Sequence, residues 1–323
     1  MRLLNNRVLA ILGLACLALA LQTTLLLRTA PNPAQRSTSI PQEEKIIRYA
    51  SVGNSMLSWS NFQRILEQVF LAAGYKVQRD SYLRLGCSLS SLYYGWFNQL
   101  ETIFSYIGWT NLQGVFVNNE QWDFIMFNDR TQWPARDESR QETVGVLKEI
   151  YAPLLMDHQP QAIPIFLQTM AHKEPNISFS EDLGDFDEFS QRLIDGIALY
   201  KRTLDKLLGR DPDSNDATRI APMGRAYIIG RKKYPELWET MYSEDGFHMS
   251  QKGAVLQSFL MFWTITGEAP PPYDPTWWDF LTRRQYQRSD LPNEEEAALL
   301  YEVAQSAYEE QLKQQQQPQR PPP

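Results

Sequence analysis

Apolar residues in the first third of the folded region change from a strand-like to a helical spacing. Residues 46–52 (Ile-Ile-Arg-Tyr-Ala-Ser-Val) are a short β-prone run that ends at Gly53. Residues 61–73 follow with the spacing of an amphipathic helix, closed by Gly74. The pattern predicts a strand, a loop and a helix in that order.

The same order recurs along the chain. Two more pairs, each a β-prone run followed by a helical pattern, are 122–127 with 137–156 and 162–167 with 186–208. Residues 220–229 offer a further strand region, and 254–265 form an apolar helical run. Strands that alternate with helices indicate a parallel sheet covered by helices on both faces. We therefore predict a three-layer α/β/α sandwich with a central, mainly parallel sheet.

The N-terminus predicts a contact with a membrane. Residues 8–27 are almost uncharged, follow Arg2 and Arg7, and are long enough to cross a hydrocarbon core as a helix. The run lacks a clear small-residue cleavage site, so residues 1–28 are interpreted as an uncleaved signal anchor rather than a cleaved signal peptide. The expected location is the secretory pathway, as a single-pass membrane protein of the Golgi or ER lumen or the cell surface, or as a secreted protein.

Composition divides the rest of the chain. Residues 29–44 are rich in Pro, Ser and Thr and predict a stem. The domain itself is expected at 45–267. Residues 268–323 predict a peripheral C-terminal extension, with one surface helix at 293–314 and a disordered Gln/Pro tail.

Charge and cysteine content exclude several classes of protein. The net charge is −7 and no long basic stripe is present, which argues against a nucleic-acid partner. Cys16 lies in the apolar N-terminal run, so it could not easily meet Cys87, the other cysteine, in a disulfide. Three scattered histidines give no zinc-binding pattern, and no phosphate-binding loop is found. No metal or other cofactor is implied.

Two short motifs carry candidate chemistry. Gly53-Asn54-Ser55 follows the first predicted strand, where open α/β sheets place their ligand sites. Asp245-Gly246-Phe247-His248 precedes the last apolar helix. Imidazole is a suitable base for a serine hydroxyl near neutral pH, and a carboxylate three residues away could orient the ring. We predict Ser55 as nucleophile, His248 as base and Asp245 as the residue that orients it. A turn residue at Asp245 and a helix cap at Ser250 are the structural alternative.

Both motifs resemble those of the SGNH (GDSL-like) hydrolases, over about residues 46–266. The resemblance implies a flavodoxin-like sheet and an oxyanion hole built from the Ser55 N–H, a glycine after the second strand and an asparagine after the third. Gly86 fits the glycine. Asn54 departs from the usual Gly-Asp-Ser block.

Two residues after the strand at 122–127 are candidates for the family's asparagine. Asn128 matches the Asn-Asp dipeptide of the family, whereas counting from the start of the strand places Gln132 at the family's asparagine position. We prefer Gln132, because the surrounding sequence resembles an SGNH branch that carries glutamine there. Either carboxamide could donate to an oxyanion.

The remaining candidates are less specific. His158 is expected at a helix end, and His172 at the rim of the cleft or in the core. Asn176 begins an Asn-Ile-Ser glycosylation sequon. Aromatic residues that could stack on a sugar, or simply pack, are Tyr93, Tyr94, Trp96, Trp109, Trp277 and Trp278.

The resemblance implies a serine-dependent ester hydrolase, an esterase or deacetylase, that acts on a small-molecule or carbohydrate ester through an acyl-serine. Two alternatives stay open. A polysaccharide O-acetyltransferase would use the same triad, and a catalytically inactive SGNH-like module would only bind glycans.

Overall fold

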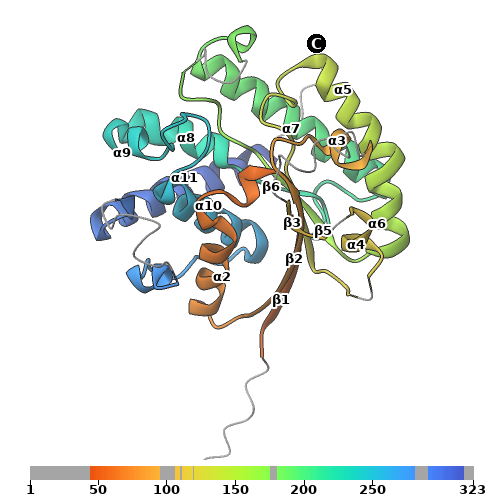
Figure 1. Cartoon of the computed structure of the whole chain (residues 1–323), viewed down its shortest axis with the longest axis horizontal. Helices are drawn as coiled ribbons and strands as arrows, with labels where there is room; N and C mark the ends of the chain where they lie inside the picture. Colours follow the sequence, from red (N-terminus) through yellow and green to blue (C-terminus); the bar gives the residue numbers. More distant parts are fainter. Residues whose placement is uncertain are drawn as a thin grey trace, which may run out of the picture. The chain divides into compact units, whose positions relative to one another are not determined.

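The computed structural model describes residues 44–94, 106–109, 111–118, 120–174, 180–280 and 290–315. Within them lies a six-stranded sheet in the order β3-β2-β1-β4-β5-β6 (Figure 1). Five strands are parallel, and β3 joins the β2 edge in the antiparallel sense. The strands are β1 (Ile46–Gly53), β2 (Lys76–Arg84), β3 (Tyr106–Gly108), β4 (Phe124–Phe127), β5 (Ile163–Leu167) and β6 (Arg219–Ala221).

Helices cover both faces of this sheet (Figure 1). One face carries α2 (Phe62–Ala72), α8 (Met223–Lys233), α9 (Pro235–Thr240), α10 (Gln251–Thr266) and α11 (Glu294–Gln315). The other carries α3 (Leu89–Tyr94), α4 (Gln113–Phe116), α5 (Asp137–Val146), α6 (Ala152–His158) and α7 (Phe186–Leu208). A π-helical turn, Leu147–Tyr151, joins α5 to α6.

The period of two along the strands divides the core into two halves. In β4, Phe124 and Met126 pack with the α2 and α10 side, whereas Ile125 and Phe127 pack with the α5 and α7 side. Successive side chains of a strand point to opposite faces, so a fully buried strand feeds both cores. The predicted three-layer α/β sandwich with a mainly parallel sheet is confirmed.

Two strands differ from the sequence prediction. Residues 220–229 are not one strand: β6 ends at Ala221, and α8 begins at Met223 after Pro222. The short strand and the helix that follows it are both apolar, and periodicity over ten residues did not separate them. The sequence pattern also did not predict β2, because the charged side chains of this strand interrupt the alternation of apolar and polar residues.

The chain beyond residue 267 packs more closely than a peripheral extension would. The helix α11 contacts α8 and α10, and its residues Leu300, Val303, Ala304 and Ala307 are buried in the same core as α10. This contact explains why α10 is apolar all round: it lies between the sheet, α2 and α11. Trp277 and Trp278 are also buried and are therefore packing residues.

Several predictions fall on residues outside the described ranges. They are the signal anchor at 1–28, almost all of the 29–44 stem, the Asn176 sequon, Trp96 and the Gln/Pro tail. In the part of the chain that the structure describes, no helix has both the length and the apolar character needed to cross a membrane.

The helix α7 approaches the loop after β4 so closely that it requires a glycine. A Cβ added at Gly196 would lie 2.0 Å from the backbone oxygen of Pro134, whereas one added at Gly145 in α5 would meet nothing within 4 Å. Glycine inside a helix is otherwise unfavourable because of its backbone entropy. The missing side chain of Gly196 therefore allows α7 to lie directly against the segment that carries Gln132.

Gly196→Ala should lower the free energy of unfolding by about 1–3 kcal/mol, because α7 must move away from Pro134. Its matched control, Gly145→Ala, should raise the free energy of unfolding by roughly 0.5–1 kcal/mol. Urea denaturation of the two variants measures both changes. Equal effects of the two substitutions would contradict the close packing at Gly196.

Candidate active site

The site begins where β1 and β4 end side by side. The parallel register pairs Val52 with Phe127, so Gly53-Asn54 and Asn128 leave the sheet next to each other. The Asn54 N–H donates to Asn128 Oδ1 at 2.9 Å. A Cβ at Gly53 would lie 2.2 Å from that same oxygen. Gly53 is therefore required for the close approach of Asn128, and it does not have a positive φ.

The Asn54 side chain joins three segments. Its Nδ2 donates to the Cys87 carbonyl at 2.8 Å, and its Oδ1 accepts from the Met56 N–H at 3.1 Å and from Asn128 Nδ2 at 3.0 Å. An aspartate, usual at this place in SGNH proteins, would lack the donor to Cys87. The asparagine at this position is therefore matched by an acceptor, the Cys87 carbonyl in the loop after β2.

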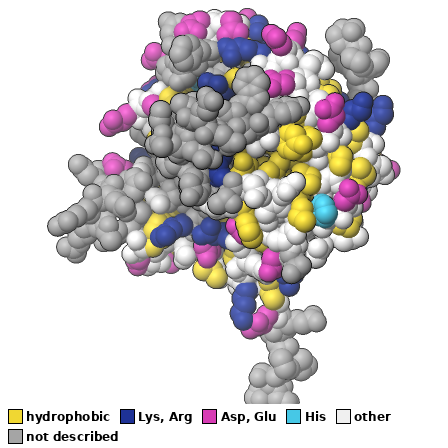
Figure 2. Space-filling model, turned by 45° about the vertical axis from the view of Figure 1, so that its right-hand side comes forward, with side chains coloured by type: hydrophobic (Ala, Val, Ile, Leu, Met, Phe, Trp, Pro, Cys, Tyr) yellow, Lys and Arg dark blue, Asp and Glu magenta, His cyan; other side chains and the backbone are white. Residues whose placement is uncertain are grey.

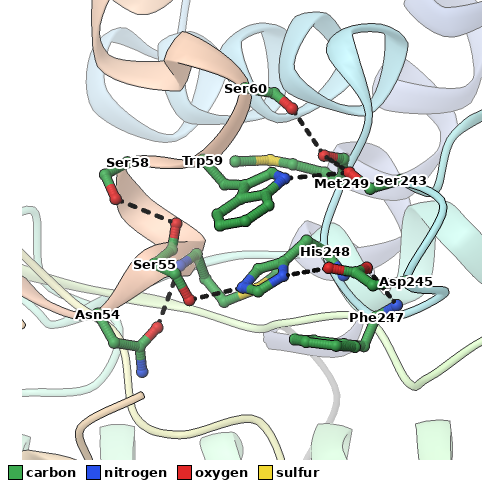
Figure 3. Close-up of polar contacts among 11 residues, drawn as sticks. Asn54, Ser55, Ser58, Trp59, Ser60, Ser243, Asp245, Phe247, His248 and Met249 are labelled. Atoms are coloured by element: carbon green, nitrogen blue, oxygen red, sulfur yellow. Dashed lines mark hydrogen bonds and ion pairs between the residues drawn. The ribbon is translucent and has the colours of Figure 1, made fainter. Parts of the chain in front are cut away.

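Ser55 opens a 3-10 turn, Ser55–Leu57, that Asn54 caps. A hydrogen bond from α10 also fixes the turn, because Gln257 Nε2 donates to the Met56 carbonyl at 3.0 Å. Ser55 is 7% exposed, and its side chain points toward the segment that precedes α10 (Figure 3). The nucleophile candidate is thus held by the ends of β1 and β4 and by Gln257 in the middle of α10.

Asp245 and His248 lie in the connection between α9 and α10. Gly246 has a φ of 70°, which lets the chain fold back so that Asp245 Oδ1 accepts the backbone N–H groups of Phe247 and His248 at 3.1 and 2.9 Å. The turn residue and the catalytic carboxylate, stated as alternatives from the sequence, are therefore the same side chain. Ser250 does cap α10, by accepting from the Gly253 N–H.

The three predicted triad side chains meet in one hydrogen-bonded chain (Figure 3). His248 Nε2 lies 2.7 Å from Ser55 Oγ, and His248 Nδ1 lies 2.7 Å from Asp245 Oδ2. With the proton on Nδ1 donated to Asp245, Nε2 accepts from the serine hydroxyl. This is the arrangement that general-base activation of a serine requires.

Burial and hydrogen bonding shift the pKa values of this pair. Burial lowers the pKa of His248 below its ordinary value, although the Asp245 charge acts in the opposite direction. For Asp245, burial raises the pKa, but the hydrogen bonds from His248 and Phe247 outweigh it, and the net pKa is lowered. At neutral pH the imidazole is therefore uncharged and the carboxylate is ionised.

Two aromatic rings enclose the imidazole (Figure 3). Trp59 stacks on His248 with ring centroids 3.9 Å apart and planes inclined by 6°, and Phe247 lies at 4.2 Å. Trp59 Nε1 donates to Ser243 Oγ at 3.1 Å, which fixes the indole over the ring. These contacts restrict the imidazole to the rotamer that reaches Ser55.

The segment after Trp59 is bound to the histidine loop through a strained turn. Ser60 and Asn61 have φ values of 49° and 60°, which are unfavourable for residues other than glycine. The Ser60 hydroxyl donates to the Met249 carbonyl at 2.8 Å, and the Ser243 hydroxyl donates to the same oxygen at 2.8 Å. The segment after Trp59 and the loop that carries His248 therefore stabilise each other's conformation.

A pocket of about 340 Å³ opens beside the triad. Its wall includes Ser55, His248, Gly86 and Gln132. Gly86 has a φ of 71°, so the loop after β2 turns sharply at this point. The structure therefore brings both preferred oxyanion-hole candidates to the cavity that holds the nucleophile.

Asn128 occupies a different position. Its two amide hydrogens are donated to Asn54 Oδ1 and to the Asp129 carbonyl, at 3.0 and 2.8 Å, and its side chain is fully buried outside the pocket wall. Of the two registers left open by the sequence, the geometry favours Gln132 over Asn128 as the carboxamide nearest the reaction.

Asp129 organises the surroundings from the core. Its Oδ1 accepts the N–H groups of Leu89 and Arg130, and its Oδ2 accepts the hydroxyls of Thr143 and Tyr200, all at 2.7–2.9 Å. Burial nevertheless raises the pKa of Asp129 to about 6. One carboxyl group thus fixes the loops after β2 and β4 to α5 and α7.

The other histidines lie apart from the triad. His158 is the last residue of α6. His172 is buried at the pocket wall, where its ring packs on Phe247 and its Nδ1 lies 3.0 Å from Ser180 Oγ. Among the described residues, no cluster of three or more His, Cys, Asp or Glu side chains could hold a metal ion.

A second, more open cavity of about 910 Å³ adjoins the first and shares Trp59 and Leu85 with it. Its wall also includes a set of hydroxyl-bearing residues, Ser58, Ser60, Thr240, Tyr242, Ser243 and Ser250. Asp245 reaches this wall, whereas Ser55 and His248 reach the smaller pocket. Trp59 therefore separates an apolar compartment from a polar one.

Sequence reasoning did not identify Trp59, Phe247 or Arg130 as parts of the site. Arg130 lies on the wall of the smaller pocket, two residues before Gln132. Only its place after a predicted strand could have indicated a role, because arginine is common in surface loops. Trp59 lies in the irregular segment between strand and helix, where periodicity carries no information.

The similarity of this chain to known proteins is structural. No family model matches the chain. No curated protein matches it either. A DUF4886 family protein from Bacteroides uniformis superposes with a TM-score of 0.59 at 16% identity, covering 81% of this chain and 95% of that one. The two chains share the fold of the central sheet and its flanking helices.

Two further solved structures carry SGNH-type descriptions. A candidate SGNH hydrolase from Slackia heliotrinireducens has a TM-score of 0.48 at 17% identity, with 68% of this chain and 100% of that chain covered. A GDSL-like lipase from Bacteroides thetaiotaomicron has a TM-score of 0.36 at 14% identity, with 68% and 88% covered. The chemistry of this chain must therefore be argued from its own residues.

Asn54→Asp should destabilise the protein, because a carboxylate oxygen would face the Cys87 carbonyl where Nδ2 now donates. We expect the free energy of unfolding to fall by about 1–3 kcal/mol at pH 7. The loss should shrink in acid, since a protonated carboxyl group could donate to Cys87 again. Urea denaturation at pH 7 and pH 5 measures both effects.

Asn111→Asp is the matched control. The Asn111 side chain is exposed and accepts from the Gly114 N–H, which a carboxylate can also do. Little change is expected there. If Asn54→Asp is as stable as this control at pH 7, the donor role of Asn54 is refuted.

Proposed function

We propose that the protein is a serine hydrolase that cleaves ester bonds through an acyl-serine intermediate. The observation that carries the proposal is the continuous chain from Ser55 Oγ to His248 to Asp245, with 2.7 Å at each link. A binding module has no physical need for a base within hydrogen-bond distance of a buried serine hydroxyl. The SGNH-like fold is consistent with this chemistry.

In the first half-reaction, Ser55 Oγ attacks the ester carbonyl while His248 Nε2 takes the hydroxyl proton. The charge that develops on the carbonyl oxygen is stabilised by donors at the pocket wall, for which we propose the N–H groups of Ser55 and Gly86 and the carboxamide of Gln132. Collapse of the tetrahedral intermediate breaks the bond to the alcohol, which leaves with the proton from His248.

The second half-reaction returns the serine. Water enters, His248 accepts one of its protons, and the oxygen attacks the acyl-serine carbonyl. Collapse of the second tetrahedral intermediate breaks the bond to Ser55 Oγ, which takes the proton back from His248, and releases the carboxylic acid and free Ser55. During each half-reaction His248 is transiently an imidazolium, and both Asp245 and the face of the Trp59 indole stabilise that positive charge.

A second candidate, transfer of the acyl group to another alcohol, follows from the polar cavity beyond Trp59. The hydroxyl groups on its wall donate to backbone carbonyls, and their oxygens could accept hydrogen bonds from a sugar or polyol acceptor next to the acyl-serine. The mechanism differs only in the acceptor, because an acceptor hydroxyl would replace water as the nucleophile that His248 activates. Comparing hydrolysis rates with and without added alcohols distinguishes the two.

The first test is hydrolysis of p-nitrophenyl acetate and longer-chain p-nitrophenyl esters by the purified full chain. Ser55→Ala and His248→Ala should each reduce kcat/KM by at least about 10³-fold, because each removes one member of a unit that acts together. His158→Ala, at the end of α6, is the matched control and should retain activity.

Labelling by a fluorophosphonate separates the enzyme from a binding module. The folded wild-type protein should be labelled at Ser55, and Ser55→Ala should not. A folded wild-type protein that neither turns over esters nor reacts with the probe would refute the hydrolase and favour the glycan-binding alternative.

The pH profile should report the lowered pKa of His248. Because the base must be neutral, kcat/KM should rise with pH, with a half-point below the ordinary histidine value of about 6.5, and stay level through neutrality. Asp245→Asn removes the charge that opposes the shift, so the half-point should move further down as the rate falls. A half-point above 6.5 in the wild type would contradict this assignment.

A further inference from the structure

Among the described residues, Arg130 is the one arginine or lysine on the wall of the pocket beside the triad. It follows Asn128-Asp129 after β4 and lies on the same wall as Ser55, Gly86 and Gln132. Its guanidinium carbon lies 4.6 Å from the centre of the Trp133 ring, so the side chain is supported by an aromatic face. The residue is half-buried.

Within the described ranges, no carboxylate forms an ion pair with this guanidinium. The adjacent carboxylate of Asp129 accepts two N–H groups and two hydroxyls, as set out above, and the guanidinium is not among these donors. Arg136, whose positive charge acts on Arg130, is itself paired with Asp182 at 2.6 Å. The described wall of the pocket therefore carries the Arg130 cation and no carboxylate side chain beside the nucleophile candidate.

Such a charge is unfavourable without a partner. Burial and the positive charge of Arg136 lower the pKa of Arg130 and outweigh the opposing charge of Asp129, which means that the charged form of Arg130 is destabilised where it lies. A desolvated cation is normally paired with an anion. In a catalytic pocket, the missing anion can come from the substrate.

The rest of the wall indicates what surrounds that anion. Met56, Leu85 and Phe247 make the pocket largely apolar, and its volume of about 340 Å³ suits a short chain or a single ring. An apolar pocket with one fixed cation selects a ligand that has a hydrocarbon body and one negatively charged end. Guanidinium and carboxylate groups match each other through paired hydrogen bonds.

We propose that Arg130 binds a carboxylate on the substrate, so that the protein prefers esters that carry a carboxylate near the scissile bond. This proposal rests on the hydrolase function above and adds the class of substrate. The carboxylate belongs to either the acyl group or the alcohol, since both meet at Ser55. In either case Arg130 is a specificity-determining residue of the site.

Matched ester pairs test the preference. On the acyl side, the 4-nitrophenyl monoester of adipic acid is compared with 4-nitrophenyl heptanoate. On the alcohol side, 4-acetoxybenzoic acid is compared with its methyl ester. For at least one pair, the wild-type kcat/KM should favour the anion by about 10-fold or more, the scale of one charge-assisted hydrogen bond.

Arg130→Gln should abolish that preference, and Arg130→Lys should keep part of it, because lysine retains the charge but not the paired donors. Each ratio is measured on one protein preparation, so a partly unfolded variant does not distort it. Arg202→Gln, an exposed arginine of α7 that lines neither cavity, is the matched control and should keep the wild-type ratio.

A binding measurement keeps the inference testable if no ester turns over. Calorimetry with Ser55→Ala should detect tighter binding of monomethyl adipate than of dimethyl adipate, and of 4-acetoxybenzoic acid than of its methyl ester, for at least one pair. The Ser55→Ala/Arg130→Gln protein should lose the difference.

The outcomes separate the two proposals. Hydrolysis of neutral and anionic esters at equal rates in the wild type would overturn the role of Arg130 and leave the hydrolase intact. Carboxylate binding that depends on Arg130, without turnover or probe labelling, would refute the hydrolase and support an anion-binding site. Equal affinity for the members of both pairs would overturn the inference in the absence of turnover.

Discussion

The site depends on the hydrogen bonds between Asn54 and Asn128, which join the ends of two neighbouring parallel strands. The pairing of β1 with β4 brings the two side chains within reach, and the missing side chain of Gly53 leaves room for the amide. The Ser55 turn continues from Asn54, and the loop with Arg130 and Gln132 continues from Asn128. A change in the junction would therefore displace both the nucleophile candidate and the part of the pocket wall that Arg130 and Gln132 form.

Two carboxyl groups show how far the surroundings decide the chemistry of one side chain. Asp129 is fully buried, and four donors do not compensate for the loss of solvent, so its pKa rises to about 6. Asp245 is partly open to solvent and accepts two N–H groups and the imidazole, so its pKa falls. The first serves as a structural centre near its titration point, whereas the second stays ionised beside the base.

Much of the fold was predictable because the elements that build it have a clear period. The helix at 186–208 and the strand at 46–52 were found within a residue of their bounds, since one is long and amphipathic and the other is a compact apolar run. The charged strand β2 and the border between β6 and α8 were not. The burial of α11 depends on a groove formed by α8 and α10, which no local pattern in residues 293–314 contains.

The same limit applies to the site. Ser55, Asp245 and His248 were found through short motifs whose members lie close in sequence. Trp59 stacks on the imidazole of His248, and Arg130 shares a pocket wall with Ser55. In both pairs the two residues are distant in sequence, so only folding brings them together. The double role of Asn54 as donor and acceptor likewise depends on Cys87 and Asn128, from two other loops.

The left-handed turn at Ser60 and Asn61 has a consequence for how the protein opens. Its unfavourable backbone is held by a bond to the carbonyl of Met249, the residue after His248. If either loop detaches, the other loses both that bond and the indole stack, so the two halves of the triad should open as one cooperative unit. Nucleophile and base, almost two hundred residues apart in the chain, would then share a single local stability.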